Sequence, residues 1–356
     1  MAAFTVFWFF CIGTCVGSFL NVIVWRWPRG HSLVREPSAC PACQTLIRWD
    51  DNIPIIGWLR LRGRCRTCQA AISTRYPLVE TLVGVQFVGL LCAEALTGGA
   101  TIPVRPIDPY AGVVWIIWYA MQPDLLRLYA WHLGLLFVAN IIWLIDEDGQ
   151  TLPRSLLPMV VTGGLVALAA FPDLHPTLNI QLTRGEWFAI GQRWQGVLGG
   201  GVGLLAGIGV GALSAGMVRH QGFGSVTFSG VLLLGAIGLA LGWQAAISTA
   251  LLASVVALLR AGIERVASKS WIGSSVFDIW LALHIQLLSW RWLDRQPWWP
   301  SSQSPWFVIG LSILVIEVLR VLTDSIRKPL LIAKNVDGDP QLADEIFNPK
   351  GEPSQS

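Results

Sequence analysis

The stretch that decides the fold runs from Gly17 to Glu80. It contains, in order, Gly17-Ser18-Phe19-Leu20-Asn21, Cys40-Pro41-Ala42-Cys43, Cys65-Arg66-Thr67-Cys68 and Arg75-Tyr76-Pro77-Leu78-Val79-Glu80. Apolar runs lie on both sides of the cysteines, and each has about 20 residues, the length of a helix that crosses a bilayer. The stretch therefore predicts a polar loop, held together by a metal ion, between two membrane helices.

Composition places the whole chain among membrane proteins. Hydrophobic residues make up 53% of the chain and charged residues only 13%, whereas about 25% of a soluble domain is charged. The formal net charge of +3 is too small to favour a nucleic-acid partner. The first apolar run continues through Trp25 with no basic segment before it, so we expect it to remain as a membrane helix and not to be cleaved as a signal peptide.

The apolar runs predict an all-α polytopic membrane protein with about 8 to 9 transmembrane helices and a small zinc-binding loop. The expected spans are about 4–25, 77–97, 126–145, 154–171, 195–217, two spans within 226–261, 275–291 and 305–323. The two spans within 226–261 are expected to turn at Gly242-Trp243. A shorter apolar piece at 111–121 is expected to lie at the membrane interface.

The distribution of arginines predicts the orientation of the chain. Residues 26–76 contain nine arginines and no lysine, and basic loops favour the cytoplasmic side of a membrane. Counting spans from this loop brings Asp146, the turn at 219–225 and the C-terminal tail to the same side. Five tryptophans are expected in an aromatic belt at the opposite interface: Trp290, Trp292, Trp298, Trp299 and Trp306.

The cysteine pairs predict a metal site. Cys40 and Cys43 are separated by 21 residues from Cys65 and Cys68, and two such pairs can supply the four thiolates of a tetrahedral Zn²⁺ site. Two disulfides are the alternative, but the cytoplasm keeps thiols reduced. Because four thiolates leave no open coordination position, we expect the zinc to be structural.

Further residues in this region resemble the N-terminal domain of the bacterial prepilin peptidases. The resemblance covers about 70 residues and rests on Gly17-Ser18-Phe19-Leu20-Asn21, Arg26 with Pro28, both cysteine pairs, Asn52-Ile53-Pro54 with Trp58, Gly63-Arg64-Cys65-Arg66, and Arg75-Tyr76-Pro77 with Glu80. It implies a multi-pass enzyme of the bacterial inner membrane that removes the leader peptides of type IV prepilins and pseudopilins on the cytoplasmic side. It also implies methylation of the new N-terminus with S-adenosylmethionine.

The resemblance assigns roles to parts of the chain. The expected parts are a first transmembrane helix at 1–25, the zinc loop at 26–76 in an N-terminal domain that extends to about 97, an aspartic peptidase-like membrane domain at 98–262, additional membrane segments at 263–326 and a disordered cytoplasmic tail at 327–356. The family associates its cysteine loop with methylation. The residues that match the family in this domain, and that are expected to serve methylation or substrate binding, are Asn21, Arg26, Asn52, Arg75 and Glu80.

The family cleaves with two aspartates, and only one of the two matches here. Asp146 stands seven residues before Pro153, as in the first family motif. The second motif, Gly-x-Gly-Asp, reads Gly222-Phe223-Gly224-Ser225, so Ser225 occupies the second aspartate position. A serine hydroxyl cannot shuttle a proton near neutral pH without an adjacent base, so we expect Ser225 not to act as the second acid.

Three other side chains are possible replacements for the missing acid. Asp148 lies two residues from Asp146, which on a helix is roughly the opposite side. Asp278 is an acid within a membrane segment, although a place in the first turn of a helix explains it more simply. His220 precedes the altered motif, but as a turn residue it has no visible partner.

Three functions follow as alternatives. The first is a working peptidase and methyltransferase with Asp146 and an unidentified second acid. The second is a homologue without peptidase activity that only methylates. The third is a non-catalytic protein that binds pilins in pilus assembly or type II secretion, in which the glycines Gly199, Gly203, Gly207 and Gly211 serve close helix packing alone.

Overall fold

The computed structural model describes residues 2–103, 105–108, 112, 117, 122–175, 192–218, 228–267, 274–301 and 304–338. These residues form helices and two isolated β-bridges. The elements are α1 (Ala2–Arg26), η1 (Trp27–Arg29), α2 (Ile56–Arg60), α3 (Arg75–Leu90) with its π-helical continuation η2 (Leu91–Ala95), α4 (Pro123–Glu147), α5 (Leu156–Ala170), η4 (Pro172–Leu174), α6 (Gln192–Val218), α7 (Phe228–Leu241), α8 (Trp243–Ala267), α9 (Ser275–Asp294) and α10 (Trp306–Gly338).

Membrane helices make up most of the described chain. Six segments are long and apolar enough to cross a bilayer: Ala2–Arg29, Arg75–Ala95, Pro123–Glu147, Trp194–Ser214, Trp243–Ala267 and Trp306–Arg327. Two shorter apolar helices, α5 and α7, lie between them. This confirms the helical membrane class, while the total of about 8 to 9 spans stays a prediction.

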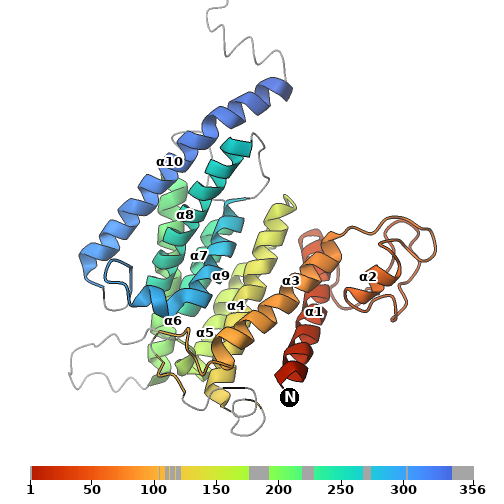
Figure 1. Cartoon of the computed structure of the whole chain (residues 1–356), viewed down its shortest axis with the longest axis horizontal. Helices are drawn as coiled ribbons and strands as arrows, with labels where there is room; N and C mark the ends of the chain where they lie inside the picture. The colour runs from red at the N-terminus through yellow and green to blue at the C-terminus, as the bar shows by residue number, and fades with distance from the viewer. Residues whose placement is uncertain are drawn as a thin grey trace, which may run out of the picture.

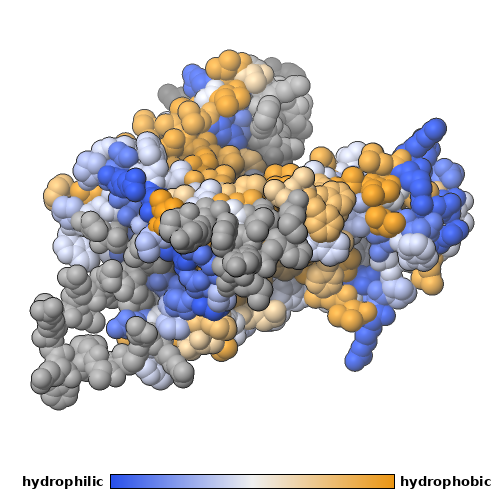
Figure 2. Space-filling view, turned by 60° about the horizontal axis from the view of Figure 1, so that its bottom comes forward, coloured by the Kyte–Doolittle hydropathy of each residue, from blue (hydrophilic) through white to orange (hydrophobic). Residues whose placement is uncertain are grey.

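The helices pack as a bundle with an attached pair (Figure 1). Helices α4–α10 form the bundle, α1 and α3 pack against each other at one side, and the cysteine loop with α2 lies beside the upper ends of that pair. Figure 2 shows a largely apolar surface over the helices and strongly polar residues on the cysteine loop at the right. The polar loop is therefore outside the apolar bundle, as the sequence predicts.

Glycines bring two helix pairs into close contact. A Cβ on Gly13 would lie 2.8 Å from the Cα of Gly84, and one on Gly17 would lie 2.8 Å from the Cα of Glu80, so α1 and α3 touch backbone to backbone. On α6, Gly203, Gly207 and Gly211 likewise face the backbone of α7. Within membranes, small residues are the usual means of such close approach.

The structure refines several predicted boundaries. The predicted break between the sixth and seventh spans is confirmed at Gly242, where φ is +94°. Helix α10 continues to Gly338, past residue 327, at which the sequence indicated the start of a disordered tail. The short apolar piece at 111–121 lies almost wholly outside the described residues.

The prediction of a tryptophan belt is wrong for two of its five members. Trp290 and Trp299 are buried in the bundle core. The indole N–H of Trp299 donates to the hydroxyl of Ser248 at 2.7 Å, which fixes the segment after α9 against α8. Trp292, Trp298 and Trp306 are exposed, as an interfacial position requires.

Candidate metal centre and active site

The two cysteine pairs form two similar turns. In the first, the N–H of Gln44 donates to the carbonyl of Cys40 at 2.8 Å, and in the second the N–H of Gln69 donates to the carbonyl of Cys65 at 3.1 Å. Both glutamines have left-handed backbone angles, with φ of +57° and +60°. Each turn thus folds its two thiols toward one point.

The four sulfurs fit a tetrahedral metal ion. The Sγ atoms of Cys40, Cys43, Cys65 and Cys68 all lie within 4.8 Å of one another. Cys40 and Cys68 are 3.8 Å apart, and Cys43 and Cys65 are 3.9 Å apart. A tetrahedron with Zn–S bonds of about 2.3 Å has sulfurs separated by about 3.8 Å, so the donor set suits zinc. The cluster can hold a structural ion but offers it no open position for chemistry.

An aspartate connects the second cysteine turn to the segment between the pairs. The carboxylate of Asp51 accepts hydrogen bonds from Arg66 at 2.5 Å and from Arg60 at 2.6 Å, and its side chain is only 4% exposed. The hydrogen bonds from Arg66 and then Arg60 hold the pKa of Asp51 well below its usual range. Since Arg66 lies between Cys65 and Cys68 and Arg60 lies in α2, the Asp51 carboxylate links the metal turn to α2.

Glu80 links α3 to the loop and to α1. Its buried carboxylate accepts a hydrogen bond from the N–H of Ile55 at 2.7 Å and another from the hydroxyl of Ser18. Ile55 has a φ of +62°, an unfavourable angle for a β-branched residue. The Glu80 carboxylate therefore fixes a strained backbone where the loop meets the helix pair.

The other residues taken from the family resemblance do not gather in one pocket. The side-chain amide of Asn21 donates to the carbonyl of Tyr76 at 3.2 Å and so joins α1 to the start of α3. Arg26 is buried and donates to loop carbonyls, including that of Glu36 at 2.7 Å. Asn52 lies exposed. The geometry gives Asn21 and Arg26 roles in shaping the loop.

Replacing Glu80 tests its link to Ile55. Glu80→Ala leaves the N–H of Ile55 without its acceptor, which costs about 1–3 kcal/mol for a buried group. We expect faster hydrogen exchange at that amide and faster proteolysis of the loop. Glu80→Gln keeps an acceptor oxygen and should behave nearly as the parent protein. Unchanged exchange at Ile55 in the alanine variant would contradict this role.

Asp146 lies in the last turn of α4, at the end of the helix. The N–H of Gly149, whose φ is +62°, donates to the carbonyl of Asp146 at 2.9 Å, and the N–H of Gln150 donates to that of Ile145 at 3.1 Å. This glycine-ended helix stop presents the aspartate at the edge of the bundle. A half-buried carboxylate at such an edge can meet both water and a peptide chain.

Arg75, the first residue of α3 after the cysteine loop, ties the start of α3 to the turn that follows Asp146. Its guanidinium forms an ion pair with the carboxylate of Asp148, and it donates to the carbonyl of Leu144 at 3.4 Å. Sequence reasoning expected Arg75 and Asp148 in separate roles and did not pair them. Asp148 lies just beyond the helix and is engaged by an arginine, which makes it a poor substitute for the second acid.

The altered motif, Gly222-Phe223-Gly224-Ser225, and His220 before it lie outside the described residues. Helix α7 begins at Phe228, shortly after this motif. The indole of Trp131, near the start of α4, donates to the carbonyl of Ala240, near the end of α7. Because the two helices are antiparallel, the start of α7 points toward the end of α4 that carries Asp146.

Asp278 belongs to a buried ion pair. As the sequence suggested, it lies in the first turn of α9. It is only 3% exposed, and its carboxylate accepts a hydrogen bond from Arg260 of α8 at 2.6 Å. The ion pair joins α8 to α9 and accounts for this acid without a catalytic role.

The helical bundle and its four-cysteine loop make this a multi-pass membrane protein with a loop that can hold a metal ion. Comparisons with known proteins show its family. Residues 11–94 match the model of the bacterial peptidase A24 N-terminal domain. The chain is 52% identical over 88 residues to the prepilin leader peptidase/N-methyltransferase of Myxococcus xanthus, a match that covers 25% of this chain and 26% of that protein. No solved structure matches the chain.

Two longer matches extend through the membrane domain. The prepilin leader peptidase/N-methyltransferase of Klebsiella pneumoniae is 32% identical over 255 residues, which is 70% of this chain and 90% of that protein. The protein of the same name from Stutzerimonas stutzeri is 32% identical over 270 residues, 69% of this chain and 76% of that protein. The chain therefore belongs to the prepilin leader peptidase/N-methyltransferase family.

Proposed function

We propose that the protein is a membrane prepilin peptidase of the aspartic type that also methylates its product. Its substrates are type IV prepilins or pseudopilins, and its place is the bacterial inner membrane with the cysteine loop in the cytoplasm. The observation that carries this proposal is the contact between Arg75 and Asp148, because it fastens the zinc loop to the turn that carries Asp146. This contact supports the proposal that the loop and Asp146 act at the same end of the bundle.

Cleavage needs one group that takes a proton from water and one that protonates the leaving amine. Asp146 supplies one carboxylate at the bundle edge. Ser225 stands where the family has the second, and its hydroxyl cannot serve as a proton donor without a neighbouring base. We therefore expect cleavage that depends on Asp146 but is slow.

The methylating step uses the loop. S-adenosylmethionine, when bound, would supply an electrophilic methyl group for the neutral α-amine of the cleaved product and would leave as the demethylated thioether. Cys40, Cys43, Cys65 and Cys68 would hold a zinc ion, and this ion would keep the loop folded. Asn21, Arg26 and Glu80 fix the loop to the helix pair, so methyl transfer depends on these side chains through the shape of the loop.

Replacing Asp146 tests the peptidase assignment. Asp146→Asn keeps the size of the side chain but removes its proton transfer, so leader removal from a prepilin in lipid nanodiscs should fall by about 10²–10⁴. Asp173→Asn, at a more exposed carboxylate paired with Arg127, is the control and should cleave normally. Cleavage that survives Asp146→Asn would remove this residue from the mechanism.

The substitution at Ser225 favours a second candidate, a homologue that methylates without cleaving. In that case, labelled S-adenosylmethionine transfers its methyl group to a pre-cleaved pilin peptide while no leader is removed from the intact prepilin. If neither reaction occurs and the prepilin still binds, the non-catalytic pilin-binding function is supported.

A further inference from the structure

The middle of the cysteine loop, residues 46–59, carries large apolar side chains that the rest of the chain does not cover. Six of them are exposed: Leu46, Ile47, Trp49, Ile53, Ile56 and Leu59. Trp49 is 82% exposed, although an indole is among the side chains that gain most from burial. We call residues 46–59 the exposed apolar segment.

The exposed apolar segment is folded as a compact unit. The turn that carries Trp49 packs on α2, because the carbonyl oxygen of Asp51 lies against Gly57 where a side chain would begin. Within α2, Ile56 and Leu59 are three residues apart and lie on one face of the helix. The apolar side chains are therefore presented by a fixed backbone.

This unit is fixed at the depth of the membrane helices. The N–H of Ile55, directly before α2, donates to the carboxylate of Glu80 at 2.7 Å. Glu80 follows Arg75, the first residue of a candidate membrane span, by five residues, a rise of about 7.5 Å. Figure 1 shows α2 beside the upper part of α1 and α3 and not beyond their ends. The start of α2 is therefore level with the first two turns of a membrane helix.

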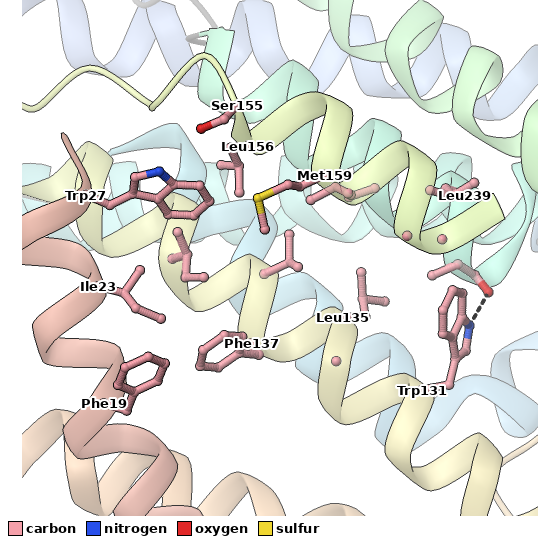
Figure 3. Close-up of a pocket in the computed structure, with 18 of the residues that line it drawn as sticks. Phe19, Ile23, Trp27, Trp131, Leu135, Phe137, Ser155, Leu156, Met159 and Leu239 are labelled. Carbon is pink, nitrogen blue, oxygen red and sulfur yellow. Dashed lines mark hydrogen bonds between the residues drawn. The ribbon is translucent and has the colours of Figure 1, made fainter. Parts of the chain in front are cut away.

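The start of the cysteine loop also lies against the membrane domain. Trp27 and Leu33 line an apolar pocket together with residues of α1, α4 and α5. Figure 3 shows the indole of Trp27 facing Leu156 and Met159 of α5 across this pocket. The loop therefore begins beside the first turn of α5 and does not extend away from the membrane helices into water.

Unpaired positive charge follows the exposed apolar segment directly. Arg62 and Arg64 are exposed, and no described residue forms a hydrogen bond or an ion pair with either guanidinium. The acids of the loop are already engaged, since Asp50 and Asp51 bind other arginines and Glu36 pairs with a histidine. Residues 26–76 contain nine arginines against these three acids. The surplus charge favours an anionic partner.

An anionic lipid surface fits both features. Indole and aliphatic side chains enter the boundary between headgroups and acyl chains, and arginines beside them bind lipid phosphates. A soluble anion would pair with the arginines but leave the apolar side chains in water. The bilayer around α1 and α3 is already next to the segment, so binding needs no further partner.

We propose that the exposed apolar segment inserts into the interface of the surrounding bilayer, with Arg62 and Arg64 on the phosphates of anionic lipids. The cysteine loop is then a membrane-surface domain, held by α1 and α3 on one side and by lipid on the other. Lipid supplies the apolar contacts that the loop does not make within the chain. This inference depends on neither catalytic step of the proposed function.

Charge variants test the attachment in nanodiscs of the full chain. Near an anionic surface, each arginine contributes about fivefold to binding, and proteolysis follows the detached fraction. With phosphatidylglycerol present, Arg62→Gln combined with Arg64→Gln should speed chymotryptic cleavage after Trp49 by about 30-fold. Lysine at both positions keeps the charge and should restore slow cleavage. In phosphatidylcholine alone, the parent and the glutamine variant should be cleaved at equal rates.

A distant arginine and the bound metal are the controls for these variants. Arg295→Gln, at an exposed arginine just beyond α9, should not change cleavage after Trp49 in either lipid. Zinc content reports whether the cysteine loop of each variant is folded. Equal acceleration of the glutamine variant in both lipids, with zinc retained, would place the role of the arginines within the protein and overturn the proposal.

Photocrosslinking identifies the partner without changing an arginine. A benzoylphenylalanine in place of Trp49 should form adducts with lipid in the same nanodiscs. One in place of Trp58, whose indole N–H donates to the carbonyl of Ile72 inside the loop at 3.0 Å, should crosslink only within the chain. The absence of lipid adducts at position 49, or adducts with a second copy or an added prepilin in their place, would overturn the proposal.

Discussion

Ser225→Asp is expected to raise the rate of leader removal by about 10²–10⁴, the usual contribution of one general acid or base. The substitution restores the second carboxylate of the family motif. Two close carboxylates do not ionise together easily, so one keeps its proton to donate to the leaving amine while the other activates water. The rate is measured by mass spectrometry of a prepilin incubated with the protein in nanodiscs.

Two variants show whether the gain comes from proton transfer. Ser225→Asn has the size of the aspartate without its acidity and should leave the rate unchanged. Asp146→Asn combined with Ser225→Asp should lose the gain, because the chemistry needs both carboxylates. If the asparagine and aspartate variants cleave equally fast, the residue at position 225 is not placed for catalysis.

Local spacing predicted the metal site because the geometry of such a site is local. Two residues between cysteines fix each turn, and Gln44 and Gln69 complete both turns in the same way. The helix end at Asp146 was equally predictable from the sequence, since Gly149 and Pro153 stop a helix within a few residues. In both cases the structural determinants lie within one short segment.

Contacts between distant segments were not predictable in this way. Arg75 and Asp148 are separated by 73 residues, and their pairing depends on how α3 and α4 tilt against each other. Asp278 looked like a helix-end charge, and its burial against Arg260 depends on the packing of α8 and α9. Tryptophan is common at membrane interfaces, but Trp299 points inward and donates to Ser248. The periodicity of apolar residues indicates which residues share a face of a helix. It does not indicate which other segment packs against that face.

Removal of the metal should unfold the cysteine loop and leave the helices intact. The loop has little core of its own, because Trp49, Leu46 and Leu59 are all well exposed, whereas Cys40 and Cys65 are among its few buried residues. Zinc binding to such small sites contributes about 10–16 kcal/mol of folding free energy, far more than the loop's surface ion pairs. Cys65→Ser should therefore lose bound zinc, and limited proteolysis should cut within 30–74.

Loss of zinc in Cys65→Ser should affect the loop but not the membrane helices. This difference tests which activity depends on the loop. The membrane helices bury their own apolar faces and hold their backbone hydrogen bonds internally, so circular dichroism of Cys65→Ser should keep its helical signal. Methyl transfer should be lost, while any cleavage that depends on Asp146 should weaken only as far as the contact between Arg75 and Asp148 is disturbed. Cys92→Ser, at an exposed cysteine outside the cluster, should retain zinc and both activities. A loop that resists proteolysis without zinc would mean that hydrogen bonds such as those of Asp51 and Glu80 hold it folded by themselves.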